Sequence, residues 1–168
     1  IQQVKDLAKV AHTYGVVFHT DAVQAVGHIP VSVQELQVDM LSAGAHKFGG
    51  PKGIGFLYLR QGIQTDIFMH GGGQERGRRA GTENVAGIVG MAAAMEDAVS
   101  KIEYQDLNAL CEKSSLSILR NGFWKDISET IEGVEVNGSM GARMPGNLNV
   151  LIRGVDSEAL LLHLNHEG

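Results

Sequence analysis

The chain has 168 residues, with 14 Lys+Arg against 19 Asp+Glu, which gives a formal net charge of −5. This acidic balance argues against a general binder of nucleic acid or of anionic membranes, because both attract a concentrated positive surface. With 43% hydrophobic and 20% charged residues, the composition is that of a globular chain rather than a disordered one.

Cysteine usage and the apolar segments indicate where the protein works. The single cysteine, Cys111, excludes an intramolecular disulfide and a multi-cysteine zinc site, as is usual in a reducing compartment. No run approaches the roughly 18–20 apolar residues that a membrane-spanning helix needs. The first six residues have no signal-peptide pattern. We therefore expect a cytoplasmic protein with no membrane contact and no direct contact with nucleic acid.

The first hundred residues alternate between predicted helices and short apolar strands. Apolar residues at helical spacing predict a first helix that ends before Tyr14-Gly15. Of three predicted strands, the first two lead into polar residues, at Thr20-Asp21 and at His46-Lys47. In chain order, the later elements are a strand over 16–19, a helix-like segment from about 22, a turn near 33–36, and strands over 39–43 and 54–59.

The second half of the chain is predicted to be mainly helical. Its expected elements are helices over about 84–100 and 104–120, strands over 134–136 and 148–152, and a helix that begins at 156–158. Asp156 suits the N-cap of that last helix. A boundary near residues 100–105 divides the chain into domains over 1–102 and 103–168.

Alternating strands and helices favour a doubly wound α/β sheet, which binds its ligands beyond the carboxyl ends of the strands. Asp21 and Lys47 lie 26 positions apart, enough for one crossover that would bring both strand ends to one edge. A desolvated lysine can form a Schiff base, and a carboxylate can keep a pyridine nitrogen protonated, as pyridoxal phosphate chemistry requires. Taken singly, Lys47 is also an ordinary loop residue and Asp21 an ordinary N-cap.

Three ordered motifs, at residues 19–25, 45–55 and 71–84, read HTDAVQA, AHKFGGPKGIG and GGGQERGRRAGTEN. With their intervals, they closely resemble the cysteine desulfurases of the class V aminotransferase family, which are fold-type I pyridoxal phosphate enzymes. The resemblance extends over essentially the whole chain, including residues 145–150 and 156–160. It implies that 1–102 are the C-terminal half of the cofactor-binding large domain, a mostly parallel sheet with helices on both faces. Residues 103–168 would be part of a smaller, truncated α+β C-terminal domain.

The same resemblance implies a set of site residues. Lys47 would hold pyridoxal 5'-phosphate covalently and move protons at the substrate α-carbon. Asp21 would face the pyridinium nitrogen, and Gln24 would donate to the ring hydroxyl. His46 would bind the phosphate, and Thr82 would reach the phosphate of the neighbouring subunit, which implies a homodimer. No metal is expected, because the pair His163 and His166 lacks a carboxylate arrangement.

One position departs from the family pattern. The family commonly has a hydroxyl residue three positions before the lysine, where this chain has Gly44. Ser42 lies two residues further back and shares the same strand face, but it cannot simply inherit the role. Phosphate binding would then rest more on His46, Thr82 and backbone N–H groups.

The resemblance implies conversion of L-cysteine to L-alanine, with the sulfur passed to an enzyme cysteine as a persulfide. The sulfur acceptor would be an iron–sulfur scaffold or a tRNA-thiolation protein. The family's reactive cysteine lies shortly after the segment that resembles residues 147–168, so we expect it outside this chain. Cys111, in a helical pattern, is interpreted as a structural thiol.

The chain begins with Ile1 rather than methionine, and we expect it to be part of a longer protein and inactive alone. The missing N-terminal part would supply an aromatic residue that stacks on the cofactor, and the missing C-terminal part an arginine for the substrate carboxylate. Two related activities stay open, selenocysteine lyase and class V aminotransferase. A non-catalytic fragment that serves as an interaction module is the alternative from another functional class.

Overall fold

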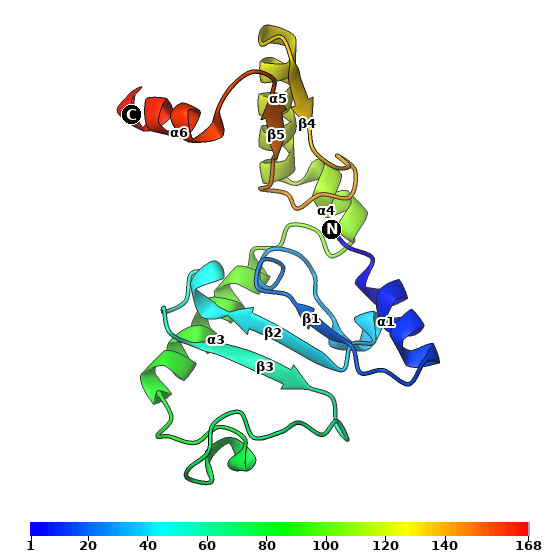
Figure 1. Ribbon diagram of the computed structural model, residues 1–168, viewed down its shortest axis with the longest axis vertical. Helices are drawn as coiled ribbons and strands as arrows, with labels where there is room; N and C mark the ends of the chain where they lie inside the picture. The colour runs from blue at the N-terminus through cyan, green and yellow to red at the C-terminus, as the bar shows by residue number, and fades with distance from the viewer. Residues whose placement is uncertain (168) are drawn as a thin grey trace. The chain divides into compact units, whose positions relative to one another are not determined.

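A computed structural model describes residues 1–167, and these form two compact units (Figure 1). The first unit spans Ile1–Leu107 and the second begins at Asn108. The predicted boundary lay a few residues earlier, at 102/103. The assignment of the two segments to a cofactor-binding domain and a small domain of a longer enzyme stays a prediction. No helix within residues 1–167 is both long and apolar enough to span a bilayer.

The first unit is built on a three-stranded mixed sheet in the order β1-β2-β3. The strands are β1 (His19–Asp21), β2 (Met40–Gly44) and β3 (Gly55–Leu59). β1 pairs with β2 in parallel and β3 pairs with β2 in antiparallel, with Asp21 opposite Ser42 and Gly44 opposite Gly55. The predicted α/β class is confirmed, and the carboxyl ends of β1 and β2 lie at one edge of the sheet.

One face of this sheet is packed against the core and the other is exposed. On one face, Leu41 and Ala43 are buried in the main core. The helix α3 (Val85–Ser100) packs against that core through Met91, Ala94, Met95 and Ala98, and Figure 1 shows it running behind the sheet. The opposite face carries exposed side chains, among them His19 and Asp21. The strand ends that carry the motif residues are therefore open to solvent in this part of the protein.

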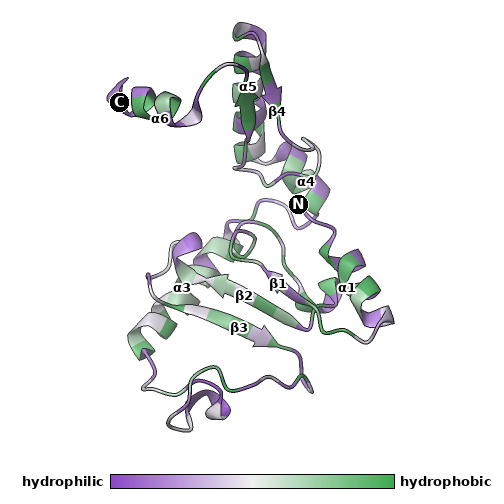
Figure 2. Ribbon diagram, viewed as in Figure 1, coloured by the Kyte–Doolittle hydropathy of each residue, from purple (hydrophilic) through white to green (hydrophobic). Residues whose placement is uncertain are grey.

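The remaining helices of the first unit follow local sequence signals. The helix α1 (Val4–Thr13) has Tyr14 as its C-cap, and Gly15 follows with φ +67° in the left-handed region, as the predicted stop requires. The short helix α2 (Val33–Leu36) begins after Ser32, whose Oγ accepts from the Glu35 N–H. The single-turn 3₁₀ helices η1 (Ala45–Lys47) and η2 (Gln74–Gly77) complete the unit. In Figure 2, α3 is mainly hydrophobic, whereas the turn at η2 is hydrophilic.

Two predictions in this unit were wrong in detail. The strand expected over 16–19 begins only at His19, because pairing starts where the Phe18 carbonyl accepts from Asp39 N and Met40 N. The helix-like segment from about residue 22 is a series of turns. Gly27 adopts φ +79° there, and a Cβ on it would lie 2.6 Å from the Phe48 Cβ. The segment around Gly27 therefore packs closely on Phe48 and forms turns where a helix was expected.

The second unit contains three helices and a two-stranded sheet. In place of the single helix predicted over 104–120, it has α4 (Leu107–Lys113) and α5 (Ser115–Thr130). Ser114 separates them with an extended backbone, and its Oγ accepts from Ser117 N–H as an N-cap. The antiparallel strands β4 (Val134–Val136) and β5 (Val150–Ile152) precede α6 (Ser157–Glu167). Asp156 Oδ1 accepts from Ala159 N–H at 2.9 Å, as expected of a cap.

Candidate functional site

Asp21 and Lys47 come to the same edge of the sheet. Asp21 is the last residue of β1, and η1, which contains His46 and Lys47, directly follows the end of β2 at Gly44. Because β1 and β2 are parallel, both segments leave the sheet at its carboxyl edge. A carboxylate and an amine are thereby presented on adjacent strand ends, the arrangement that the spacing of the motifs predicted.

The Asp21 carboxylate is exposed and locally oriented. Its Oδ1 accepts from Val23 N–H at 2.9 Å, which turns the chain out of β1. The next residue, Ala22, donates its N–H to the Ser42 carbonyl at 2.9 Å and keeps this end of β1 in register with β2. Because turns and not a helix follow, this contact is an Asx turn and not the helix N-cap that Asp21 could have formed.

The backbone that carries Lys47 is held from two sides. His28 Nε2 lies 2.8 Å from the Lys47 carbonyl oxygen, and the Ala45 carbonyl accepts from Phe48 N–H and Gly50 N–H. A Cβ on Gly50 would lie 2.8 Å from the Ala45 Cβ, so this tight turn requires glycine. Lys47 itself is half-buried. His28 is a supporting residue that the motifs did not indicate, because its contact crosses 19 positions of chain.

The structure gives a physical reason for the glycine at position 44. A Cβ on Gly44 would lie 3.2 Å from His46 Cε1 and 3.3 Å from His46 Nδ1. The His46 imidazole thus lies close to position 44, where the family commonly has a hydroxyl side chain. A serine or threonine at position 44 would require the exposed His46 ring to shift by a few tenths of an ångström.

The other two predicted residues, Gln24 and Thr82, lie in exposed turns and loops and not at the strand ends. Gln24 is exposed in the turns that follow Asp21. Thr82 is exposed in the loop before α3, and none of the hydrogen bonds within residues 1–167 joins it to Asp21, His46 or Lys47. Its predicted role concerns a neighbouring subunit. The roles of all five site residues therefore remain predictions.

The loop that contains Thr82 is ordered by its own contacts. Gln74 Oε1 accepts from Gly81 N–H at 3.2 Å, and Ala80 N–H donates to the Met69 carbonyl at 3.1 Å. Glu75 and Arg76 have φ values of 48° and 58°, a left-handed conformation that costs free energy for residues other than glycine. Such strain often marks functional segments, and this one lies inside the third motif.

A buried carboxylate supports the amino-terminal ends of the same strands. Asp39 has no exposed surface, and its Oδ2 accepts from Phe18 N–H at 2.7 Å and lies 2.9 Å from His12 Nε2. Its Oδ1 forms an ion pair with Arg60, which follows β3. Burial by itself raises the pKa of Asp39, but the hydrogen bonds from Phe18 and His12 and the Arg60 charge outweigh it, so the pKa lies below its usual value. The motifs gave no sign of this network.

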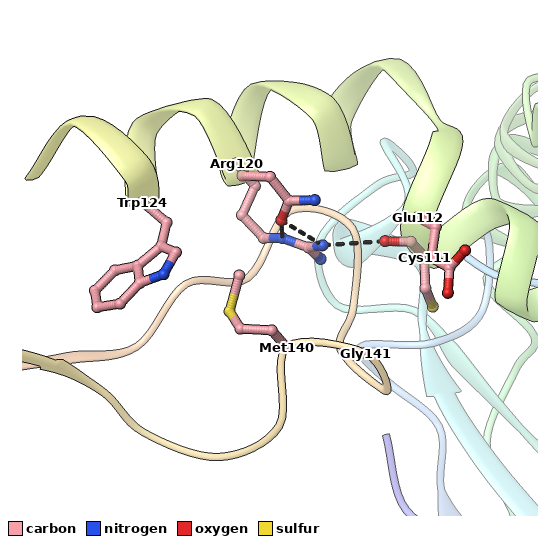
Figure 3. A pocket seen from close by; sticks show the side chains of 7 residues that line it. Cys111, Glu112, Arg120, Trp124, Met140 and Gly141 are labelled. Carbon is pink, nitrogen blue, oxygen red and sulfur yellow. Dashed lines mark hydrogen bonds between the residues drawn. The ribbon is translucent and has the colours of Figure 1, made fainter. Parts of the chain in front are cut away.

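A separate cavity lies in the second unit and contains none of the predicted site residues (Figure 3). It has a volume of about 390 Å³ and is lined by Cys111, Glu112, Arg120, Asn121, Trp124, Met140 and Gly141. Cys111 is 2% exposed, and burial raises the pKa of its thiol although the Arg120 charge acts in the opposite direction. The buried Arg120 donates to the carbonyl oxygens of Cys111 and Met144, each at 3.0 Å. A buried thiol with a raised pKa suits the structural interpretation of Cys111 and not a nucleophile.

The sequence profile of the aminotransferase class-V family matches residues 1–168. The chain belongs to that family. The resemblance that the three motifs carry is therefore confirmed. A class-V relative, the cysteine desulfurase IscS of Dictyoglomus turgidum, is 47% identical over 168 residues, which cover 100% of this chain and 41% of that protein.

Solved structures agree with the class-V assignment. A NifS-like protein from Rickettsia africae superposes with a TM-score of 0.87 at 27% identity, over 99% of this chain and 44% of that one. The structure of SspA in complex with cysteine gives a TM-score of 0.69 at 29% identity, over 100% of this chain and 43% of that one. The chain thus has the expected fold and spans about two fifths of the length of its class-V relatives.

Proposed function

We propose that the protein is a pyridoxal phosphate-dependent cysteine desulfurase, which converts L-cysteine to L-alanine and transfers the sulfur to a cysteine thiolate. The observation that carries the proposal is the placement of Asp21 and Lys47 at one edge of the sheet, Asp21 at the end of β1 and Lys47 in η1 just after the parallel strand β2, each within a family motif. The cysteine desulfurase names of relatives at up to 47% identity support the choice of this activity within the class-V family.

The chemistry of the residues at this edge fits the cofactor. When bound, pyridoxal phosphate supplies a ring that withdraws electrons from the substrate α-carbon. The Lys47 amine would bind the aldehyde carbon and then carry a proton to and from that α-carbon. The Asp21 carboxylate would hold a proton on the ring nitrogen. Gln24 would donate to the ring hydroxyl, and His46 and the neighbouring subunit's copy of Thr82 would bind the phosphate in a homodimer.

The substrate and the sulfur route follow from the same proposal. L-Cysteine as substrate is supported by SspA, a structural relative solved in complex with cysteine. Cys111 does not suit the role of sulfur carrier, because it is buried and its thiol pKa is raised. The carrier would be another cysteine, which would pass the sulfur to an iron–sulfur scaffold or to a tRNA-thiolation protein.

The test compares products from the full-length natural protein supplied with pyridoxal phosphate. With L-cysteine we expect L-alanine and sulfide in the presence of a thiol reductant, and no keto acid. Lys47→Ala should lower the rate by at least about 10²–10⁴-fold, because it removes the group that moves the proton. Lys52→Ala, an exposed lysine in the same glycine-rich turn, should keep the wild-type rate.

Formation of a keto acid from L-cysteine would instead identify an aminotransferase. Turnover restricted to L-selenocysteine would identify a selenocysteine lyase. Equal rates for Lys47→Ala and the wild type would overturn the proposed role of Lys47.

A further inference from the structure

His19 and Ser42 meet on the open face of the sheet. His19 Nε2 lies 3.1 Å from Ser42 Oγ. One residue belongs to β1 and the other to β2, so this hydrogen bond joins the two strands whose ends carry Asp21 and Lys47. Neither residue has a part in the proposed function as stated so far.

The strand register places this pair directly beside Asp21. Asp21 and Ser42 are opposite one another across the two strands. His19 precedes Asp21 by two residues, so both side chains leave β1 on the same face. The burial pattern agrees, since His19 and Asp21 are exposed and Ser42 is half-buried, while Leu41 is 2% exposed on the other face.

The position of the hydroxyl on β2 follows from the packing of His46. Ser42 is the hydroxyl residue of β2, and the next position on the same face is Gly44. The His46 ring lies 3.2 Å from where a Cβ on Gly44 would be, so a side chain at position 44 would require this ring to shift by a few tenths of an ångström. Ser42 therefore supplies the hydroxyl on this face of β2. It lies opposite Asp21 in the strand register and forms a hydrogen bond with His19.

We propose that His19 and Ser42 are positioning residues for Asp21, an inference that rests on the proposed cofactor site. The proposal takes the His19 tautomer with the proton on Nε2, which donates to Ser42 Oγ and leaves the Ser42 hydroxyl proton to donate to a neighbouring acceptor. In this proposal the acceptor is the Asp21 carboxylate, because Asp21 lies opposite Ser42 on the adjacent strand and the two side chains leave the sheet on the same face. The pair thereby orients the Asp21 carboxylate toward the position of the ring nitrogen.

The test uses the full-length natural protein reconstituted with pyridoxal phosphate that carries nitrogen-15 in its ring. The nitrogen-15 chemical shift reports protonation of the ring nitrogen directly, and a change of global stability does not move it. In Ser42→Ala and His19→Gln we expect the signal to move toward that of an unprotonated ring. The dissociation constant of the cofactor should rise about fivefold, the scale of one hydrogen bond.

Two further variants make the result specific. Ser42→Thr keeps the hydroxyl and should restore the wild-type shift and affinity. Ser100→Ala removes an exposed hydroxyl at the end of α3 and should change neither. The double variant of His19 and Ser42 should lose no more affinity than either single variant, because both act through one interaction.

Unchanged chemical shift and affinity in Ser42→Ala, with the cofactor still attached to Lys47, would overturn the positioning role and leave the proposed function standing. Additive losses in the double variant would also contradict it. A wild-type protein that attaches no cofactor at Lys47 would refute the proposed function and the positioning role together.

Discussion

Asp39 is the residue on which three segments of the first unit converge. Its carboxylate contacts His12 of α1, the backbone N–H of Phe18 before β1 and Arg60 after β3. It has no exposed surface, so the loss of one partner leaves an uncompensated polar group in the interior. This network holds the amino-terminal ends of the strands whose opposite ends carry the candidate site.

Replacement of Asp39 should therefore lower stability without touching the site. Asp39→Asn keeps an acceptor for Phe18 N–H but removes the charge, and we expect the free energy of unfolding to fall by about 2 kcal/mol. The pKa of Asp39 is lowered in the folded state, so its contribution is complete above the unfolded value of about 3.9 and is lost as pH falls through the folded value. Urea unfolding across the pH range measures both effects.

The stability gap between wild type and Asp39→Asn should thus shrink as the pH falls below about 4. The exposed Asp66→Asn serves as the control and should stay within about 0.5 kcal/mol of wild type. A gap that persists unchanged to pH 2 would contradict the ionised, paired state of Asp39.

Gly90 in helix α3 and Gly122 in helix α5 both occupy helical positions, but their surroundings differ. A Cβ on Gly90 of α3 would lie 2.9 Å from Pro51 Cγ, in the turn that follows Lys47. No atom would lie within 4 Å of a Cβ on Gly122 of α5. Alanine is favoured over glycine in a helix by about 1 kcal/mol at both sites. Any difference in the stability change between the two substitutions therefore comes from packing.

Gly122→Ala should therefore raise the free energy of unfolding by about 0.5–1 kcal/mol. Gly90→Ala should lower it by about 1 kcal/mol, because the rigid proline ring cannot yield without moving α3 or the turn. Circular dichroism during urea unfolding measures both changes. Stabilisation by Gly90→Ala would show that α3 does not pack closely on the Pro51 turn.

Elements that depend on neighbouring residues alone were predictable. The helix expected over about 84–100, the strands expected over 39–43 and 134–136, and the Asp156 cap follow from local sequence and match α3, β2, β4 and the start of α6. The turns after Ala22 were not, because Gly27 takes its conformation from contact with Phe48, which is distant in the chain. The break at Ser114 was missed because apolar residues at helical spacing continue on both sides of it, although serine is a favoured N-cap residue.

At the scale of the whole molecule, the motifs located the candidate site but not its supports. Spacing and motif order placed Asp21 and Lys47 at one sheet edge, which the parallel pairing of β1 and β2 provides. The contacts of His19 with Ser42 and of His12 with Asp39 require the strand register and helix placement, which no local pattern encodes. The family could be recognised from the three motifs, which contain the candidate site residues. The hydrogen bonds that support this site could be identified only from the three-dimensional structure.

The central claim is that Lys47 holds the cofactor opposite Asp21. The most direct measurement is borohydride reduction of the full-length natural protein after incubation with pyridoxal phosphate, followed by peptide mass mapping of every lysine. The account predicts a reduced cofactor adduct on Lys47 alone, its loss in Lys47→Ala and its retention in Lys52→Ala. An adduct on Lys52 or another lysine, or none in a folded sample, would contradict the account.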